Sequence, residues 1–254
     1  ITPGNFTFRT IEFEQMEYQT FCKPGNDHEL YEYYKEYGKS FFESLGLSDD
    51  KLRFKDHEKL AHYAKEACDI EYLFPFGWGE INGTHNRTDF DLSRHQEYSG
   101  KRMEYFDPYT QEKYIPYIIE STYGLDRTIL ALLCESLHKS VDDNGRERFV
   151  LSLDKSISPM KVSILPLEKK NHSELAMNIY RELRKEMMAY YDDKGNIGKR
   201  YKNSDAIGTP YSICVDNDTL ENGILTIRDR DTREQIKVST GQVEDVLKRK
   251  LVRK

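Results

Sequence analysis

Residues Ile118–Leu133 read IIESTYGLDRTILALL. The first part has the apolar pattern of a strand that carries Glu120, Gly124 suggests a turn, and apolar residues then recur at helical spacing. The pattern therefore predicts a strand that enters a helix through a glycine, with Arg127 near the helix start. A cation there, beside backbone that a ligand can approach closely, suits a polyphosphate or a purine ring. The same residues also fit a simpler interpretation, in which Asp126 caps the helix and Arg127 forms a surface ion pair.

The opening segment supplies a second set of groups at regular spacing. Its alternation and its aromatic and β-branched residues predict a strand over Phe6–Phe21. Arg9, Phe13 and Glu17 recur every four residues, so a strand would place all three on one face. A cation, an aromatic plate and a carboxylate in a row could hold phosphates, a base and an amino group. Alternatively, Phe13 points into the core of a half-buried strand and the charges lie at its rim.

A third segment, GWGEINGTHNRTDFDL at Gly77–Leu92, combines three glycines with Glu80 and Arg87 and has no helical pattern. Glycine-rich backbone beside charged side chains suits the close approach of a ligand. The segment is therefore a candidate wall of a binding site.

The chain divides near Asp142–Arg148, DDNGRER, a polar interruption with an Asn-Gly turn signal. Upstream of it, the pattern predicts helices over His28–Leu45 and Asp56–Cys68 and strands over Glu71–Gly83 and Lys113–Glu120. We therefore expect two domains, one on each side of this interruption.

The two expected domains are residues 1–148 and 149–254. In the second, strands and helices alternate, which predicts an α/β domain with a mixed sheet. Its expected strands are Lys161–Leu165, Met188–Tyr191, Tyr211–Val215, Ile224–Ile227 and Gln235–Val238, and its expected helices are Ser173–Met187, Ile197–Ala206 and one that starts near Ser239.

The composition is that of a folded chain. It has 254 residues, of which 37% are hydrophobic and 12% aromatic, and it has no run of about 18 apolar residues that could span a membrane. The first residues, ITPGNFTFRT, lack the order of a signal peptide. The four cysteines are scattered, without CxxC pairs or histidines at zinc-finger spacing. We therefore expect a cytoplasmic protein with no membrane partner, no disulfide framework and no structural metal.

The net charge of −6 conceals an asymmetry along the chain. Residues 151–254 hold 20 Lys and Arg against 16 Asp and Glu, a net charge of +4, which leaves 18 against 28, or −10, upstream. The C-terminal part is therefore the better candidate for contact with the phosphates of a nucleic acid. Its basic ending, LKRKLVRK, also fits a solvated helix face.

Taken together, these segments resemble the glycyl-tRNA synthetases, which are class II enzymes. The resemblance runs in collinear order over nearly the whole chain. It rests on ITPGNFTFRT, EFEQME, FPFGWGEINGTHNRTDFDL, YSGK and EKYIPYIIESTYGLDR, and then on SPMKVSILPL, YDDKGNIGKRY, DAIGTPY and LTIRDRDT. It implies the dimeric type of eukaryotes and archaea, of which this chain would be the C-terminal portion. The implied fold is an α+β class II antiparallel-sheet catalytic core, in part, followed by an α/β anticodon-binding domain.

The resemblance implies an activity, glycine-tRNA ligase. ATP activates glycine as glycyl-adenylate, and the glycyl group then passes to tRNA(Gly). Arg9 would bind a phosphate of ATP, Phe13 and Arg127 would enclose the adenine, and Glu120 would also belong to the ATP site. Mg²⁺ would balance the phosphate charge, with Glu120 as its candidate ligand. Arg9, Glu17 and Arg127 would be the catalytic residues.

The same resemblance implies how the amino acid and the tRNA are bound. Glu17, Glu120 and Thr122 would surround the glycine ammonium group, and Arg87 would pair with its carboxylate. The implied contacts with the anticodon are Arg200, Tyr201, Asp205, Arg228 and Arg230. Cations and aromatic rings can hold an unstacked base, and a carboxylate can read its edge.

The chain departs from the family pattern at several points. Motif 1 and the first half of motif 2 are expected upstream of Ile1, and motif 1 forms much of the dimer interface in the family. Ile11 stands where the family usually has Arg, and Ser121–Thr122 stands where it usually has Pro-Ser. The methyl group of Thr122 could narrow the glycine pocket. The alternative function is a non-catalytic, synthetase-like protein that binds nucleic acid.

Overall fold

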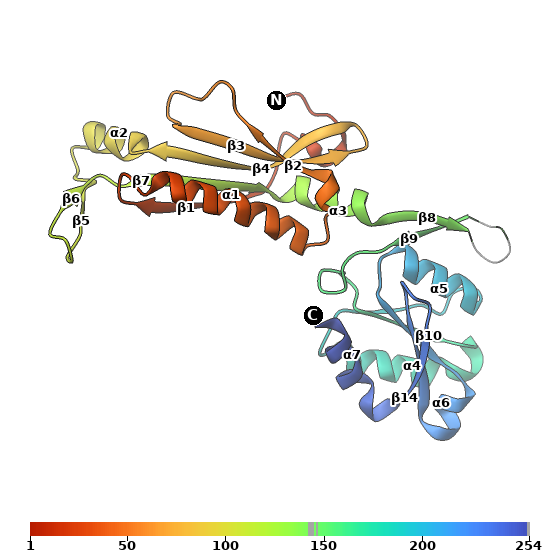
Figure 1. The fold of residues 1–254 in the computed structure, drawn as a ribbon. Coiled ribbons are helices and arrows are strands. Elements are labelled where there is room, and N and C mark those ends of the chain that lie inside the picture. Colours follow the sequence, from red (N-terminus) through yellow and green to blue (C-terminus); the bar gives the residue numbers. More distant parts are fainter. Residues whose placement is uncertain (142–144, 146, 253–254) are drawn as a thin grey trace. The chain divides into compact units, whose positions relative to one another are not determined.

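The computed structural model of the chain describes residues 1–141, 145 and 147–252. It divides into two compact units, Ile1–Glu135 (unit 1) and Ser136–Lys254 (unit 2) (Figure 1). None of the helices in the described ranges is both long and apolar enough to cross a membrane.

The division between the units lies upstream of the polar segment Asp142–Arg148. Strand β8 (Leu137–Val141) pairs with β9 (Glu147–Leu151), and β9 packs against helix α5 (Ile197–Ala206) of unit 2. The hairpin therefore belongs to unit 2. Of the segment that the sequence suggested as the boundary, residues 142–144 and 146 lie outside the described residues.

Unit 1 is built on an antiparallel sheet of five strands in the order β1-β7-β4-β3-β2. The strands are β1 (Gln15–Cys22), β2 (Leu52–Asp56), β3 (Glu66–Phe74), β4 (Gly77–Thr88) and β7 (Tyr117–Gly124). Because β7 lies between β1 and β4, its residues face partners from both sides.

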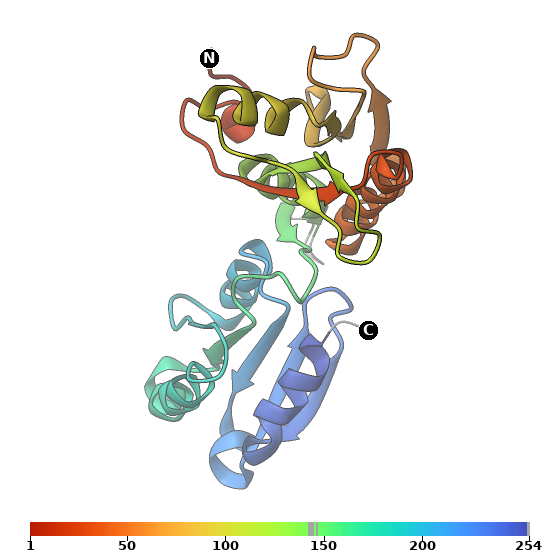
Figure 2. The same cartoon turned by 90° about the vertical axis from the view of Figure 1, so that its left-hand side faces the viewer.

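Helices α1 (Asp27–Ser44) and α3 (Leu125–Ser136) cover one face of this sheet, and Figure 2 shows α1 end-on beside it. Phe42 of α1, Ala131 of α3 and Ile70 of β3 are buried in one cluster, which holds the helices on the sheet. The remaining elements of unit 1 are α2 (Phe90–Ser99), the short strands β5 (Tyr105–Phe106) and β6 (Lys113–Tyr114), and the 3-10 turns η1 (Phe6–Phe8) and η2 (Asp49–Lys51).

Two of the elements expected in unit 1 are wrong. The helix expected over Asp56–Cys68 does not form. Residues 57–65 lie outside helices and strands, and Ala67 and Cys68 are buried in β3, which pairs on both sides. Tertiary pairing here overrides helix propensity. The strand expected over Phe6–Phe21 begins only at Gln15.

Two other expected strands are interrupted, whereas both helices that flank the sheet are confirmed. Glu71–Gly83 contains a turn, so it belongs to both β3 and β4, and Lys113–Glu120 is broken between β6 and β7. Helix α1 matches the helix expected over His28–Leu45, and α3 follows Gly124 as the pattern predicted.

Unit 2 contains the mixed sheet that the sequence predicted, in the order β11-β10-β12-β13-β14. Strand β10 runs parallel to β11 and β12, and the other pairs are antiparallel. The strands are β10 (Val162–Pro166), β11 (Ala189–Tyr191), β12 (Tyr211–Val215), β13 (Ile224–Asp229) and β14 (Gln235–Ser239). The helices are α4 (Lys169–Leu183), α5 (Ile197–Ala206), α6 (Asn217–Asn222) and α7 (Val243–Leu251), with the 3-10 turn η3 (Thr240–Gln242) before α7.

The two faces of this sheet differ in chemistry. One is apolar, where Ile164 and Ile213 pack with Ala176 of α4 and Leu247 of α7. The other lies under α5 and is polar. Its row of paired positions is Ser163, Ser212 and Arg228, and Ser204 of α5 donates a hydrogen bond to Ser163. The polar face therefore holds buried groups that must bond to one another.

Candidate functional site

The face of the unit 1 sheet opposite α1 carries several of the residues predicted to contact ligands. Glu17 of β1 lies across from Thr122 of β7, and Gln19 lies across from Glu120. His85 of β4 pairs with Glu120 from the other side. Since side chains alternate along strands, these positions share one face of the sheet. We call this side of unit 1 the open face.

A chain of polar contacts connects the predicted glycine-binding residues on the open face. The amide Nε2 of Gln19 donates to Glu17 Oε1 at 3.2 Å and to Glu120 Oε2 at 2.8 Å. The hydroxyl of Thr122 lies 3.5 Å from Glu17 Oε2. The structure thus brings three predicted residues together and adds Gln19. The signal for Gln19 was its position two residues after Glu17, on the same face of a strand.

Arg87 is held from several sides. Its Nε and Nη2 donate to Asp91 at 2.6 and 3.0 Å, and its Nη1 donates to Glu120 at 3.1 Å. Its guanidinium carbon lies 4.3 Å from the ring centre of Tyr63. The carboxylate of glycine would therefore have to displace an existing partner. The geometry supports a different role for Arg87, which is to position Glu120.

The charge of Glu120 bears on its expected role as a magnesium ligand. Burial raises the pKa of Glu120, and the ion pair with Arg87 offsets part of that rise. Arg87 occupies one carboxylate oxygen and Gln19 the other. Magnesium needs oxygen ligands that are free to coordinate it. The donor set around Glu120 does not fit this metal.

A pocket of about 310 Å³ lies next to this cluster and contains three of the four residues predicted for ATP, whereas Glu120 does not line it. Arg9, Phe13 and Arg127 all line it, although Arg9 and Phe13 precede β1 and do not lie on a strand face as expected. The 3-10 turn η1 and the loop after it bring them together instead. Phe13 is 54% exposed, and no described residue forms a hydrogen bond or ion pair with the side chain of Arg9.

Arg127 is positioned by contacts with two segments. Its Nε donates to the carbonyl of Phe8 at 3.1 Å, and its Nη1 donates to the carbonyl of Glu80 at 2.9 Å. Its guanidinium carbon also lies 4.4 Å from the ring centre of Phe8. One face of this cation is thus covered by an aromatic ring that the sequence patterns did not single out. A planar ligand would have to stack on the other face.

The five residues expected to contact an anticodon lie in unit 2, and most of them are buried. Arg200 is 3% exposed and donates to the carbonyls of Pro166, Asp193 and Gly195. Arg230 is also 3% exposed. It donates to two backbone carbonyls and to the neighbouring Asp231 side chain.

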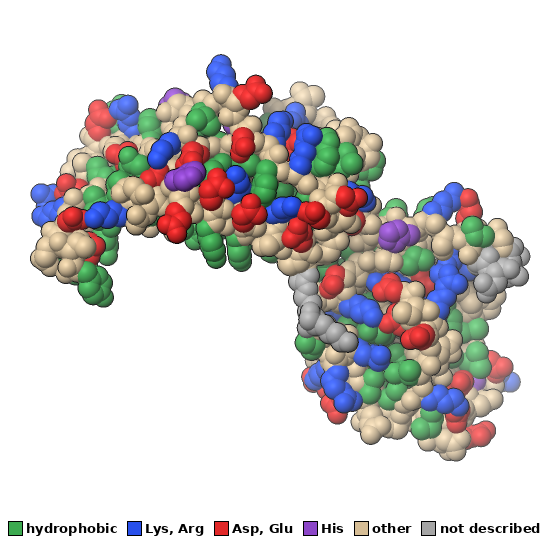
Figure 3. Space-filling view, viewed as in Figure 1, with side chains coloured by type: hydrophobic (Ala, Val, Ile, Leu, Met, Phe, Trp, Pro, Cys, Tyr) green, Lys and Arg blue, Asp and Glu red, His purple; other side chains and the backbone are tan. Residues whose placement is uncertain are grey.

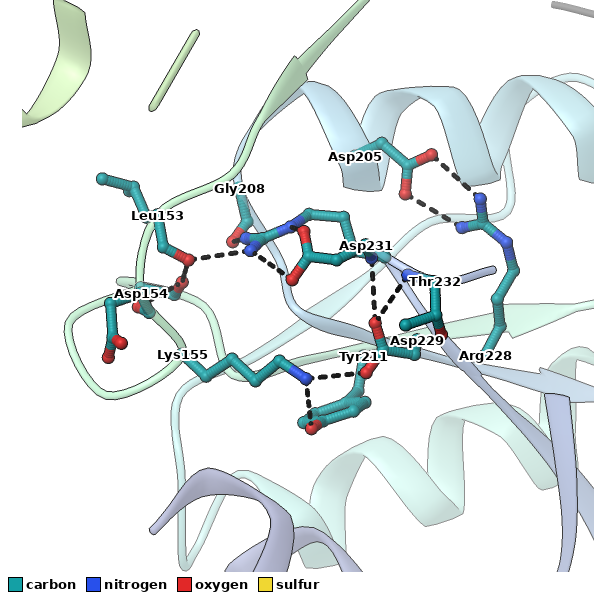
Figure 4. Close-up of polar contacts among 12 residues, drawn as sticks. Leu153, Asp154, Lys155, Asp205, Gly208, Tyr211, Arg228, Asp229, Asp231 and Thr232 are labelled. Atoms are coloured by element: carbon teal, nitrogen blue, oxygen red, sulfur yellow. Dashed lines mark hydrogen bonds and ion pairs between the residues drawn. The ribbon is translucent and has the colours of Figure 1, made fainter. Parts of the chain in front are cut away.

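Asp205, Arg228 and Tyr201 contact one another on the polar face of the unit 2 sheet. Arg228 forms two hydrogen bonds with Asp205, at 2.9 and 3.1 Å (Figure 4). Arg148 adds an ion pair with Asp205 at 3.3 Å, and the Arg228 guanidinium carbon lies 5.0 Å from the ring centre of Tyr201. The prediction that Arg200, Asp205, Arg228 and Arg230 contact RNA is therefore corrected. Their side chains are buried and already engaged within the unit, whereas a base contact needs exposed donors.

Unit 2 also has a recess bordered by cations. It measures about 780 Å³, and Lys155, Arg249 and Lys250 line it. Lys155 donates to Tyr211 Oη at 2.9 Å and to Asp229 Oδ2 at 2.7 Å (Figure 4).

On the face of the molecule in Figure 3, acidic and basic side chains are interspersed, so the negative charge of unit 1 does not form one continuous acidic patch there.

Comparison with known proteins finds similar sequences for both parts of the chain. Residues 161–250 match a family described as "Anticodon binding domain". The chain is 51% identical over 253 residues to a protein named Glycine--tRNA ligase from Clostridium kluyveri, a match that covers 99% of this chain and 54% of that relative. Proteins of the same name from Clostridium acetobutylicum and Geobacillus kaustophilus are 49% and 47% identical, with 99% of this chain and 54% and 55% of those relatives covered.

The chain spans about half the length of the curated relatives it matches. The aligned region covers both units, so the similarity extends beyond a single motif. Over 99% of its length the chain is therefore similar to part of these proteins named Glycine--tRNA ligase, and its residues 161–250 match the anticodon-binding family.

Proposed function

We propose that this protein, in its full natural length, is a glycine-tRNA ligase. The observation that carries the proposal is the 51% identity over 253 residues to a protein of that name. The open face of unit 1 adds support, because it places two carboxylates and a hydroxyl beside a pocket with an aromatic plate and cations. In the proposed reaction, the glycine carboxylate attacks the α-phosphorus of ATP and pyrophosphate leaves. The glycyl group then moves to the 3′ end of tRNA(Gly).

ATP is proposed to bind in the 310 Å³ pocket. The exposed ring of Phe13 would stack on the adenine, and Arg127 would cover its other side. Arg9 would bind a phosphate, because it is a cation without an ion-pair partner among the described residues. Positioning and charge stabilisation carry such a reaction, so no nucleophile on the protein is required.

Glycine is proposed to bind beside Glu17 and Thr122. The carboxylate of Glu17 is exposed and can accept from an ammonium group, with Glu120 and Gln19 behind it. Arg87 acts here as a positioning residue for Glu120. Mg²⁺ would accompany the nucleotide, but Glu120 is not its ligand in this proposal.

The test of activation is glycine-dependent exchange of pyrophosphate into ATP by the full-length protein. Arg9→Ala and Arg127→Ala should each lower exchange by about a hundredfold, as expected when a preorganised charged group is removed from an active site. Phe13→Ala should lower it less, because it removes a stacking ring and no charge. Arg94→Ala is the matched control, because Arg94 pairs with Glu97 on an exposed helix surface. Exchange that is unaffected by all three substitutions, or that does not require glycine, would contradict the proposed site.

Unit 2 is proposed to bind the tRNA, because it carries the anticodon-binding sequence and the positive balance of charge. We assign the backbone contacts to Arg249 and Lys250 at the recess described above, in place of the buried arginines. Lys250→Ala and Arg249→Ala should each weaken tRNA binding. They should also reduce the slope of the logarithm of the binding constant against the logarithm of the salt concentration, by about 0.7–0.9 for each phosphate that the protein no longer neutralises. An unchanged salt slope would contradict this assignment.

Three further properties belong to the same proposal. We propose that the full-length protein is a homodimer of the eukaryotic and archaeal type, which sedimentation equilibrium would test. We also propose a cytoplasmic location, consistent with four free thiols, which cell fractionation would test. Binding of tRNA without any exchange activity in the full-length protein would favour the alternative, a non-catalytic nucleic-acid-binding protein.

A further inference from the structure

A cluster of three side chains on the open face of unit 1 is not used by the proposed reaction. His57 follows strand β2, Asp69 lies on β3, and His85 lies on β4. One potential ligand atom from each residue lies within 4.8 Å of the other two. The nearest pair, His57 Nε2 and Asp69 Oδ2, is 2.9 Å apart. Two imidazoles and a carboxylate therefore converge from three neighbouring segments.

Backbone pairing fixes this convergence. The amide of His57 donates to the carbonyl of Ala67 at 3.0 Å, so the chain after β2 continues along β3. Asp69 pairs with Gly83, and Ala67 pairs with His85. Positions two residues apart on a strand point to the same side, so Asp69 and His85 both project from the open face. The ligand atoms are thus held by the sheet and by the loop that continues it.

Gly83 leaves space between these groups. A side-chain carbon at Gly83 would come within 3.2 Å of His85 Cε1 and 3.5 Å of Asp69 Oδ1. Glu80 Oε1 reaches the same space, at 3.7 Å from that point. A side chain at residue 83 would therefore crowd the histidine and the carboxylates.

The polar groups in this cluster are incompletely satisfied. Nδ1 of His85 is buried and has no hydrogen-bond partner among the described residues. The two imidazole rings lie 5.9 Å apart at an angle of 79°, so they do not stack on one another. A buried ring nitrogen without a partner costs free energy, and a bound metal ion would reduce that cost.

We propose that His57, Asp69 and His85 bind a divalent transition-metal ion, with Zn²⁺ as the reference metal. Zinc bonds to nitrogen and oxygen are about 2.0–2.1 Å long, which separates neighbouring tetrahedral ligand atoms by about 3.3 Å. The observed spread of 2.9 to 4.8 Å reaches this spacing through small side-chain rotations. Two imidazoles and one carboxylate leave a fourth position for water or Glu80, the arrangement of an open zinc site.

Metal binding can be measured directly and independently of glycine activation. The full chain is first treated with a chelator, and Zn²⁺ alone is then titrated by isothermal calorimetry, with metal content checked by mass spectrometry. The wild-type chain should bind one ion. His85→Ala and His57→Ala should each raise the dissociation constant at least tenfold, because loss of even an outer partner of a metal site costs about that much.

The matched control is His138→Ala, which removes an exposed histidine from unit 2. It should leave the affinity for Zn²⁺ unchanged. Since His57 is at the end of a strand and partly exposed, His57→Ala should keep its fold, which circular dichroism without metal would confirm. Absence of stoichiometric binding in the wild type, or equal affinity in the folded His57→Ala variant and the wild type, would overturn the proposal.

Discussion

Asp205 lies fully buried on the polar face of the unit 2 sheet (0% exposed), between two arginines. Its oxygens accept from Arg228 at 2.9 and 3.1 Å, and Arg148 lies 3.3 Å away. Asp205→Ala would leave two guanidinium groups without this counter-charge in a region of low exposure. Removing one partner from a buried ion pair costs about 3–5 kcal/mol, because the remaining charge stays desolvated.

In a unit of this size, a loss of 3–5 kcal/mol lowers the melting temperature by about 10–20 °C. Differential scanning calorimetry of the full chain measures this change. The single tryptophan, Trp78, lies in unit 1, so its fluorescence reports on the other unit in the same sample. Asp218→Ala is the matched control, because Asp218 pairs with the exposed Lys237 and such surface pairs contribute about 0–1 kcal/mol.

A second substitution separates a structural role from recognition of RNA. Adding Arg228→Leu to Asp205→Ala should recover part of the lost stability, because it removes one of the two uncompensated charges. The reasoning is refuted if Asp205→Ala has the same melting temperature as the wild type and instead weakens tRNA binding. That result would return Asp205 to the role that the sequence resemblance implied.

Three further substitutions test other parts of the structure. Burial would raise the pKa of Asp27, but its hydrogen bonds outweigh this effect and lower the pKa from 3.8 to about 2. Asp27 therefore contributes about 2 kcal/mol to the free energy of unfolding above pH 5, and this contribution is lost as the pH falls toward 2. In urea titrations, Asp27→Asn should therefore be less stable than the wild type at pH 7, and the difference should shrink in acid; a constant difference would contradict the linkage. Gly79→Ala would place a carbon 2.7 Å from the ring of Phe8 and displace that ring, so calorimetry should show at least several-fold weaker binding of an ATP analogue. Unchanged binding would show that the ring does not shape the pocket. Asn196→Ala removes a helix cap that accepts a hydrogen bond from the amide of Lys199 at 2.9 Å, so calorimetry should show unit 2 less stable by about 1 kcal/mol. Unchanged stability would mean that water replaces the cap.

Local patterns predicted much of the fold where periodicity and packing agree. Helix α3 follows Gly124 because its apolar residues recur at helical spacing and one face is buried. The strands of unit 2 were found for a similar reason, since short apolar runs lie between turn signals. The failure over Asp56–Cys68 has the opposite cause. The residues there satisfy a helical pattern, but residues 57–65 form neither helix nor strand, and residues 66–68 are part of β3, which pairs with two neighbours.

The sequence by itself determined what the chain is similar to, its two-part organisation and the identity of the candidate ligand groups, because these depend on which residues occur and in what order. Tertiary structure alone decided which of those groups are accessible. Arg9 and Arg228 are both arginines in recognisable motifs, yet Arg9 is exposed at a pocket and Arg228 is bonded to a buried carboxylate. The tertiary structure also brings His57, Asp69 and His85 together from three segments. Burial and pairing between distant segments arise from the packed sheet, and no local pattern in the sequence encodes them.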